Sequence, residues 1–289
     1  MISFIVCSIN PHACEQLRQN ISTTIGETDH EFLPFDNRQA RQGICEVYNH
    51  QARLAQGENL CFLHEDVAFL STDWGHVIED KLNESDCGVI GFSGSQVKAK
   101  ALSGVHCGRE YQLHNYTDKL GQAFRTPPSP PAFIPTVTLD GLCLFVSRPH
   151  WATHPFDEHL LHGFHGYDLD FSLQQHQAGF HNQVCYAIQI RHSSNGSFNE
   201  AWSQAMVLLH KKKWDAWLPA YTFQPTQTEA RNIESQALYE HTKTLLRGQT
   251  PLSSVKPLLL DYTRTYGLNH YARKLWIKVL YNRLLRIKR

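Results

Sequence analysis

Three short segments of the sequence combine carboxylates and imidazoles at spacings that could do chemistry. They are FLHEDV around residue 65, FHGYDLDF around residue 168 and IRHSSNGS around residue 192. In the first segment an apolar run ends at Glu65 and Asp66, where a carboxylate can hold a divalent cation that bridges the phosphates of a nucleotide. The same carboxylates could instead be a solvated strand end or the cap of the next helix. This segment therefore leaves a metal site and a purely structural role open.

The second and third segments could supply a general base and a further metal ligand. Asp168 and Asp170 stand two residues apart after Gly166, at the start of an expected helix. An aspartate there could take a proton from an attacking hydroxyl group if it faces a cleft, or it could cap its own helix. His192 follows an apolar run, and an imidazole is a good ligand for a divalent transition metal. Because the chain has 18 histidines, a single histidine can also be an ordinary surface or core residue.

Three further histidines, His159, His162 and His165, repeat at intervals of three residues and could suggest zinc. Gly163 and Gly166 interrupt the continuous helix that would place the three imidazoles on one face. We therefore expect no zinc site in this segment.

The first ninety residues alternate between strand-like and helical patterns, as expected of an α/β fold. The opening run ISFIVC is apolar and rich in β-branched residues, which is typical of a strand buried on both faces. Right-handed crossovers between such strands give a largely parallel sheet whose strands end at one edge, and a ligand should bind at that edge. We expect strands at 2–7, 30–35, 59–63 and 87–92, with helices at 11–25, 44–55 and 74–82.

The pattern changes in the middle of the chain and again near its end. Residues 93–135 are rich in Gly, Ser and Pro, so we expect a loop-dominated segment that borders the site. Beyond Pro219 we expect short helical stretches, which places a catalytic domain at 1–219 and a helical extension at 220–289. Between these segments we expect strands at 136–147 and 184–190 and helices at 168–178 and 199–214.

Composition narrows the class of protein. The chain has 289 residues, of which 42% are hydrophobic and 19% charged, which predicts a folded, soluble protein. It has no apolar run of about 18 residues and no basic, cleavable N-terminal segment. The eight cysteines are scattered, which favours reduced thiols in a cytoplasmic protein. The 27 basic and 27 acidic residues balance, so we expect no nucleic-acid partner.

The C-terminal 28 residues differ from the rest because they hold eight basic residues and no acidic one. The segment could bind an anionic membrane surface, or it could pack on the rest of the protein with a solvated basic face. The first alternative would add the inner face of the membrane to the cytoplasmic location. Spacing places Trp276, Ile277, Leu280, Leu284 and Ile287 on one side of a helix and Lys274, Lys278 and Arg289 on another.

Taken in order, seven segments resemble the family 2 glycosyltransferases of the GT-A fold, in particular the branch related to the StrF-type domain. The resemblance covers roughly residues 1–215 and implies a Rossmann-like open mixed sheet with helices on both faces. The segments are ISFIVCSIN, PFDNR, GICEVYNHQARLA, CFLHEDV, LDGLCLFVSR, GFHGYDLDFSLQQHQAGF and IRHSSNGS.

The resemblance also implies roles for individual residues. Asp168 falls at the position of the catalytic base, and Asp66 and His192 at the metal ligands. We further expect Asp140 and Asp170 on the acceptor side. The residues matching the nucleotide-sugar site are Ser8, Asn10, Asp36, Asn37, Gly43, Asn49 and Glu65.

By this resemblance the protein would be an inverting transferase that uses a nucleotide sugar, with a UDP-sugar favoured, and a glycan or lipid-linked acceptor in surface-glycan synthesis. His64 replaces the first aspartate of the family's D-x-D, so Mn²⁺ or Mg²⁺ would have fewer oxygen ligands and metal dependence is less secure. Two alternatives remain open: a nucleotidyltransferase on a similar sheet, and a degenerate domain that binds a nucleotide or carbohydrate without turnover.

Overall fold

The apolar strands of the N-terminal half assemble into a seven-stranded mixed sheet. The computed structural model describes all residues except 195, 197, 248–251 and 288–289. The order of the strands is β10-β13-β5-β12-β3-β1-β2, and β1 pairs in parallel with both β2 and β3, whereas β12 runs antiparallel to β3. The strands are β1 (Ile2–Ser8), β2 (His30–Asp36), β3 (Asn59–Leu63), β5 (Cys87–Gly91), β10 (Phe133–Thr136), β12 (Cys143–Ser147) and β13 (His181–Cys185).

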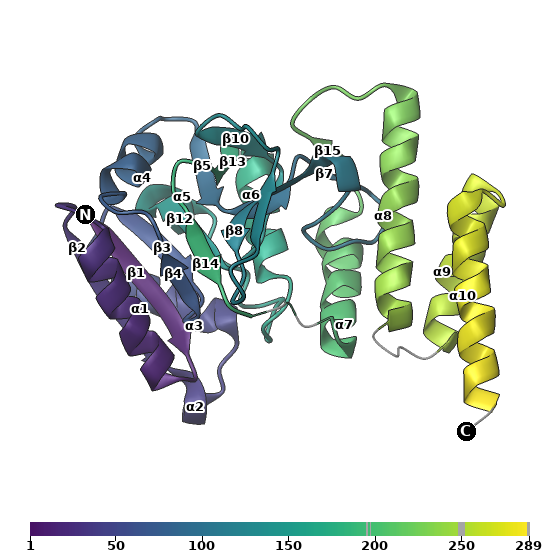
Figure 1. Ribbon diagram of the computed structural model, residues 1–289, viewed down its shortest axis with the longest axis horizontal. Helices are drawn as coiled ribbons and strands as arrows, with labels where there is room; N and C mark the ends of the chain where they lie inside the picture. Colours follow the sequence, from purple (N-terminus) through teal and green to yellow (C-terminus); the bar gives the residue numbers. More distant parts are fainter. Residues whose placement is uncertain (195, 197, 248–251, 288–289) are drawn as a thin grey trace.

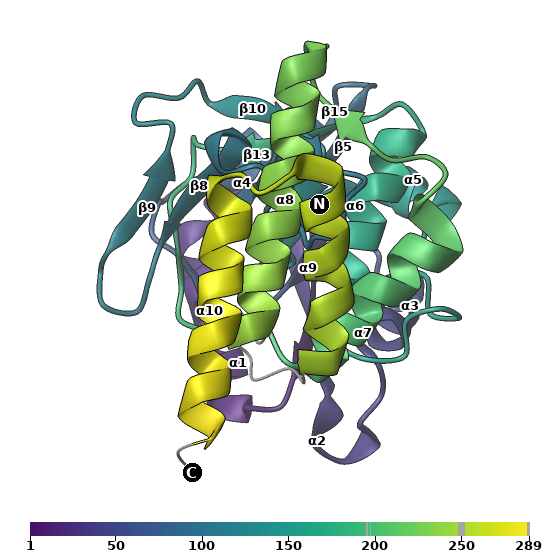
Figure 2. The same ribbon diagram turned by 90° about the vertical axis from the view of Figure 1, so that its right-hand side faces the viewer.

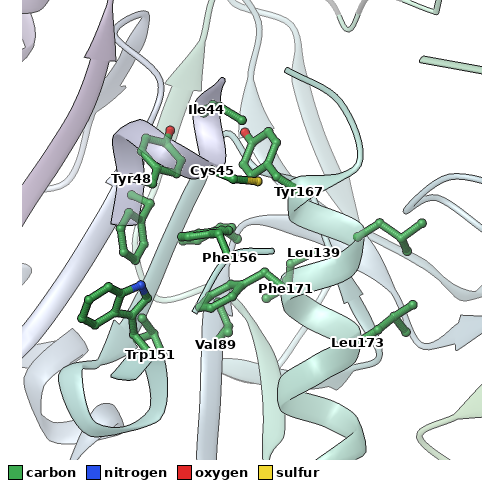
Figure 3. Close-up of a cluster of buried hydrophobic side chains, with 14 of the residues drawn as sticks. Ile44, Cys45, Tyr48, Val89, Leu139, Trp151, Phe156, Tyr167, Phe171 and Leu173 are labelled. Carbon is green, nitrogen blue, oxygen red and sulfur yellow. The ribbon is translucent and has the colours of Figure 1, made fainter. Parts of the chain in front are cut away.

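Helices cover both faces of this sheet, as predicted (Figure 1). Alternate residues of β3 enter different cores: Leu60 and Phe62 pack with α3 and α6, and Cys61 and Leu63 pack with α1 and α4. Figure 3 shows the first core, an aromatic cluster in which Tyr167 lies at the edge. The helices are α1 (Pro11–Thr24), α2 (Asn37–Ala40), α3 (Ile44–Leu54), α4 (Gly75–Leu82), α5 (Arg148–Thr153), α6 (Tyr167–Gln177) and α7 (Glu200–Leu209), which continues into a π-helical turn at His210–Trp214.

Residues 93–135 were expected to be loop-dominated, and loops do connect short strands here, but three of these strands help to build a second sheet. Its short strands follow the order β11-β6-β8-β14-β4, and β9 pairs with β8. The segment does border the site, as expected. The strands are β4 (Val67–Phe69), β6 (Ser93–Ser95), β8 (Gln112–Thr117), β9 (Ala123–Thr126), β11 (Thr138–Leu139) and β14 (Ile190–His192), with a 3-10 turn at Arg109–Tyr111 and a separate pair, β7 (Val97–Lys98) with β15 (Ala220–Tyr221).

Two strands predicted as continuous are divided between the sheets. The predicted strand 136–147 becomes the end of β10, then β11 in the second sheet and β12 in the first, and the predicted strand 184–190 becomes parts of β13 and β14. Asp140 and Gly141 separate β11 from β12, because the chain turns there to change sheets. Both divisions bring residues from the first sheet next to residues from the second.

The C-terminal extension consists of three long helices rather than the short stretches expected. They are α8 (Gln227–Arg247), α9 (Leu252–Tyr266) and α10 (His270–Ile287). In Figure 2 they run side by side, and α8 lies between the other two helices and the sheets in Figure 1. Leu275 and Val279 of α10 are buried against α8 and α9, so packing of an apolar stripe orders a helix that composition alone does not mark. None of the described helices combines the length and apolar character needed to cross a membrane.

Candidate active site

A cavity of about 1530 Å³ lies where β1, β2 and β3 end and the second sheet begins. Cys7 at the end of β1, Asn37 after β2 and His64 after β3 line it. Trp202 of α7 and His241 of α8 also line it, so the helical extension forms part of its wall. The cavity is therefore at the edge that the strand pattern predicts, although its walls come from the whole chain.

His64, Asp66 and His192 converge in this cavity. Each offers one ligand atom, and the three atoms lie within 4.8 Å of one another. Nδ1 of His64 is 3.4 Å from Nε2 of His192, which is 3.5 Å from Oδ1 of Asp66. The pairing of β4 with β14 brings the groups together, because it sets His192 opposite Val67. The structure thus brings the two predicted ligands, Asp66 and His192, together. It adds His64, which the family resemblance had treated as the replacement of a metal-binding aspartate.

Tyr167 holds His64 in a form suited to binding a metal. The tyrosine hydroxyl is 2.8 Å from Nε2 of His64 and donates to the carbonyl oxygen of Gly141 at 3.2 Å. Because this hydroxyl donates to Gly141, it accepts from Nε2–H of His64, which leaves the Nδ1 lone pair facing His192. Burial, and then the neighbouring His192, lower the pKa of His64, which keeps the imidazole neutral. Neutral imidazoles and a carboxylate fit Mn²⁺ or another transition metal better than Mg²⁺, which prefers oxygen ligands.

Asp168 also lines the cavity, together with Asp140. Burial and the negative charge of Asp140 raise the pKa of Asp168 to about 7. Its carboxylate accepts from the backbone N–H groups of Gly141 and Leu169, at 3.2 and 2.9 Å, and these bonds fix its orientation. A carboxylate with a pKa near neutrality is well matched to general-base catalysis.

Glu65, Ser8 and Asn10 lie together at the start of α1, but their polar atoms bind one another. The carboxylate of Glu65 accepts from the hydroxyl of Ser8 at 2.5 Å and from the backbone N–H groups of Ile9 and Asn10. The side chain of Asn10 caps α1 by accepting from the N–H groups of His12 and Ala13. Of the three predicted residues, Glu65 lines the cavity. The trio shapes the loop between β1 and α1, and nucleotide binding by these residues stays a prediction.

The predicted residues after β2 lie near two arginines that the sequence analysis did not single out. Asp36 caps α2 and forms an exposed ion pair with Arg38 at 2.6 Å. Asn37 is buried, holds the backbone of Gln42 with its side chain, and lines the cavity. Arg38 and Arg41 line the cavity as well. Because Arg38 is paired with Asp36, Arg41 is the better candidate for a positive charge at this end of the cavity.

Gly43 and Asn49 act on the neighbouring loop rather than on the cavity. A Cβ atom on Gly43 would lie 2.5 Å from the carbonyl oxygen of His162, so a larger residue would push this loop away. Asn49 is buried, and its side chain binds both backbone polar groups of Phe156 and the carboxylate of Glu158. Both residues therefore position the segment that leads to Asp168.

The expectation that Asp170 faces an acceptor was wrong. The carboxylate is 1% exposed, pairs with Lys213 at 2.9 Å and accepts from the indole N–H of Trp214 at 2.9 Å. Because α6 turns by about 100° per residue, Asp168 and Asp170 point in different directions. Asp168 faces the cavity, whereas Asp170 fixes α6 to the turn at 210–214. Asp140 does line the cavity, and an acceptor-side role for it stays a prediction.

Several functional candidates were missed because only the folded chain brings them together. Tyr167 gains its role from contact with His64, 103 residues away in the sequence. Two more histidines of the cavity, His106 and His114, flank Ser93, with distances of 2.8 and 2.9 Å from its hydroxyl to one ring nitrogen of each. Neither histidine belongs to a motif that the sequence analysis identified. Both lie in residues 93–135, a segment that was expected to be loop-dominated.

A family profile described as "Glycosyltransferase like family" matches residues 3–214. Among solved structures, GalNAc-T7 with UDP, GalNAc and Mn²⁺ is similar with a TM-score of 0.53 and 11% identity. That match covers 91% of this chain and 54% of the other, so this chain spans about half the length of that protein.

The mannosyltransferase PcManGT from Pyrobaculum calidifontis, in complex with GDP-Man and Mn²⁺, matches with a TM-score of 0.42 and 12% identity. This second match covers 96% of this chain and 74% of the other. A search of curated proteins finds no match. At such low identity the likeness to GalNAc-T7 concerns the fold.

Proposed function

Because the chain belongs to the glycosyltransferase-like family, we propose that it transfers a sugar from a nucleotide sugar to a hydroxyl acceptor. One observation carries the proposal: the cluster of His64, Asp66 and His192 lies in the same cavity as Asp168. Transfer needs positive charge beside the leaving diphosphate and a base beside the acceptor. The cavity holds candidates for both needs, which supports catalysis over a degenerate binding domain.

His64, Asp66 and His192 would hold the divalent cation, and we propose Mn²⁺ as the first choice. When bound, such a cation neutralises the charge that develops on the leaving nucleoside diphosphate. The two imidazoles and one carboxylate favour a transition metal over Mg²⁺. Mn²⁺ is chosen among these metals because the similar structure of GalNAc-T7 contains it. Arg41 would add positive charge at the nucleotide end of the cavity.

Asp168 would act as the base. It would accept the proton of the acceptor hydroxyl while the acceptor oxygen forms a bond to the anomeric carbon and the bond from that carbon to the diphosphate oxygen breaks. A single displacement of this kind inverts the anomeric centre. The raised pKa of Asp168, about 7, supports the role because the carboxylate is more basic than usual and can accept a proton near neutral pH.

For the donor and the acceptor we propose only the class of molecule. A UDP-sugar is the first donor to test, with a glycan or lipid-linked acceptor in the synthesis of a surface glycan. Helix α10 supports a peripheral membrane location, because Arg273, Lys274, Ile277 and Leu280 are exposed along it. The side chains at positions 281–289, including Leu284, Ile287 and Arg289 of the predicted amphipathic pattern, lie outside the described residues.

Thermal unfolding in the presence of nucleotides tests the proposal directly. UDP, GDP, CDP and dTDP would each be added with Mn²⁺, Mg²⁺ or a chelator. A ligand at about 100 times its Kd stabilises a protein by about 2.7 kcal/mol, so one nucleotide with Mn²⁺ should raise the Tm clearly. Loss of that shift with chelator supports the metal site. If no nucleotide raises the Tm under any condition, the degenerate-domain alternative gains the advantage.

The identity of the product separates the proposal from the nucleotidyltransferase alternative. Sugar transfer releases a nucleoside diphosphate, whereas nucleotidyl transfer to a sugar phosphate releases pyrophosphate. Chromatography of the reaction products distinguishes the two, and NMR of the new glycosidic bond tests inversion at the anomeric centre.

A further inference from the structure

Helix α8 of the extension forms one wall of the cavity that holds the His64 cluster. This wall lies beyond the residues that the family profile matches, which end at 214. The loop that precedes β8 is fastened to it, because Glu234 accepts from the backbone N–H groups of Lys100 and Ala101, each at 2.7 Å. The residues of the wall that face the cavity are Glu240, His241, Lys243 and Thr244 of α8, with Trp202 of α7 beside them.

His241 is the unusual residue of this wall. Its side chain is 3% exposed, and neither ring nitrogen has a hydrogen-bond partner among the residues that the structure describes. Burial, and then the charge of Lys98, lower the pKa of His241 to about 4, so the imidazole is neutral near pH 7. A neutral imidazole carries one N–H donor and one acceptor lone pair. Leaving both unpaired in a buried position is costly, so a ligand or a water molecule that reaches the ring gains by pairing with it.

The surroundings of His241 favour an uncharged ligand. The ammonium group of Lys98 is buried and already donates to the carbonyl oxygen of Ala99, the hydroxyl of Ser103 and Nε2 of His210. Lys243 and Glu240, which do face the cavity, form an ion pair with each other at 2.7 Å. The charged groups near this wall are therefore either engaged or balanced, and an anion would gain little here.

Trp202 supplies an apolar surface next to the unpaired imidazole. Its ring centroid is 5.5 Å from that of His241, and the two ring planes are inclined by 33°. An aromatic face beside a donor and an acceptor suits a pyranose ring, which has apolar C–H faces and a rim of hydroxyl groups.

The volume of the cavity also leaves room for a second ligand. Pockets for one small ligand commonly measure about 300–1,000 Å³. The cavity of about 1530 Å³ exceeds that range, and its lining runs from Cys7, Arg38 and Arg41 to His241.

We propose that Trp202 and His241 form a subsite for the sugar of the acceptor. The indole ring packs against one face of the acceptor sugar, and one imidazole nitrogen pairs with one of its hydroxyl groups when the sugar enters. The donor occupies the end of the cavity near His64, so the assignment of this sugar as the acceptor rests on the proposed function. The helical extension is then part of the substrate site rather than an appendage.

Binding of simple glycosides tests the subsite without knowledge of the natural acceptor. The probes are methyl glycosides of glucose, galactose, mannose, N-acetylglucosamine and N-acetylgalactosamine, measured by saturation-transfer NMR on the full chain with UDP and Mn²⁺ present. His241→Phe keeps the ring shape and removes both polar atoms, and His270→Phe is the matched control on an exposed histidine of α10. We expect H241F to weaken glycoside binding at least about threefold, since one buried hydrogen bond is lost, while H270F binds as the wild type does.

The outcomes separate this inference from the proposed function, because UDP–Mn²⁺ binding is measured in the same samples. Wild-type protein that binds UDP–Mn²⁺ but none of the glycosides at about 20 mM, where millimolar affinities are detected, contradicts the subsite and leaves the proposed function intact. Glycoside binding that depends on His241 without any UDP–Mn²⁺ binding supports the subsite and contradicts the proposed function.

Equal glycoside binding by H241F and the wild type overturns the assignment of His241. If H241F fails to fold, His241→Gln replaces it, because Gln also offers one donor group and one acceptor but at different positions. We then expect a loss of at least threefold in glycoside binding, and unchanged binding by this variant would overturn the inference.

Discussion

A single tyrosine hydroxyl determines which nitrogen of His64 faces the candidate metal site. Tyr167→Phe removes the acceptor of Nε2–H, so His64 can change tautomer or rotate away from His192. We expect the affinity for Mn²⁺ to fall about tenfold, the lower end of what loss of a partner behind a metal ligand usually costs. Titration with Mn²⁺, followed by electron paramagnetic resonance, measures the change.

Tyr48→Phe is the matched control for that experiment. Tyr48 and Tyr167 lie in the same aromatic cluster, and their hydroxyl groups point to the same side (Figure 3). The hydroxyl of Tyr48 contacts only the carbonyl oxygen of Leu63, at 3.4 Å, among its described hydrogen-bond partners. An equal loss of Mn²⁺ affinity in the two variants would show that packing of the cluster, and not the bond to His64, matters.

Asp168→Asn should abolish the base while leaving donor binding intact. We expect the turnover number to fall by about 10²–10⁴, the range for loss of a general base, with little change in the affinity for nucleotide and Mn²⁺. Rates of nucleoside diphosphate release and calorimetry with UDP–Mn²⁺ give the two values. Unchanged turnover would remove Asp168 from the mechanism.

The pH dependence of kcat/KM tests the environment of Asp168 as well as its role. Because burial and Asp140 raise its pKa to about 7, the free enzyme gains its active base as the pH rises from 6 to 8. We expect kcat/KM to rise over this interval and level off above it, since this ratio reports the ionisation of the free enzyme. A rate that is constant from pH 5 to pH 8 would contradict the raised pKa.

The same ionisation should affect stability in the opposite direction. The folded-state pKa lies above the ordinary value of 3.8, so the native state holds the proton more tightly than the unfolded state does. Ionising Asp168 therefore costs stability, a cost that is absent below about pH 4 and complete above about pH 7. The D168N variant should be about 1–2 kcal/mol more stable than the wild type at pH 8 and show no such gain at pH 4. Thermal unfolding at the two pH values measures the difference.

At the scale of secondary-structure elements, the sequence predicts the first sheet far better than the second. The strands of the first sheet have four to seven residues, and a buried apolar run such as NLCFL is typical of a central strand. The strands of the second sheet are two to six residues long and rich in Gly, Ser and Thr, as in Ser93–Ser95. They become strands because strands distant in the sequence complete their backbone hydrogen bonds. Local propensity cannot predict such partners.

The residues of the candidate site could be predicted only in part. Asp66, Asp168 and His192 could be identified because each lies in one of the ordered segments that resemble the family. His64, Tyr167 and His241 could not, because the role of each depends on a contact made by folding. Asp170, in contrast, was assigned to the site but does not belong to it. Its spacing from Asp168 resembles a paired acidic motif, but the helix directs its side chain toward Lys213.

The contact between α8 and the loop at residues 99–107 should control the shape of the cavity. Glu234→Ala leaves the backbone N–H groups of Lys100 and Ala101 without their carboxylate partner. We expect the free energy of unfolding to fall by about 1–3 kcal/mol, because hydrogen bonds to charged groups are stronger than those between neutral groups. We also expect faster hydrogen exchange at the backbone amides of residues 99–107. The control is Glu229→Ala on the same helix, where the carboxylate binds only Thr226 among the hydrogen bonds described. Equal exchange over 99–107 in both variants would contradict a local role for Glu234.

At the scale of the whole molecule, the cavity joins parts of the chain that sequence patterns assign to different domains. The predicted boundary near 219 falls between α7 and α8, yet both helices line the cavity. The pairing of β7 with β15 also connects the two sides of that boundary. We therefore propose that residues 1–219 and 220–289 form one functional unit.

The arrangement of α10 suggests how that unit could meet a lipid-linked acceptor. The two alternatives for this helix are compatible: Ala272, Leu275 and Val279 are buried against α8 and α9, whereas Ile277 and Leu280 are 66% and 55% exposed. Deleting the helix would expose the core beneath it, so substitutions on the outer face are the cleaner test. We choose Lys274→Glu with Ile277→Ser, which removes one basic and one apolar group from that face.

If α10 binds an anionic membrane, the K274E/I277S variant should bind vesicles of phosphatidylglycerol and phosphatidylcholine at least about tenfold more weakly than the wild type at low salt. A basic residue near such a surface contributes about 1 kcal/mol, and burial of an isoleucine side chain adds about 1.5–3 kcal/mol. The matched control, K211E/L120S, makes the same kinds of change at exposed positions outside α10 and should bind as the wild type does. Co-sedimentation measures binding, and thermal unfolding checks that both variants fold. Equal binding by the two variants would show that the outer face of α10 makes no lipid contact and that the helix serves only to support α8.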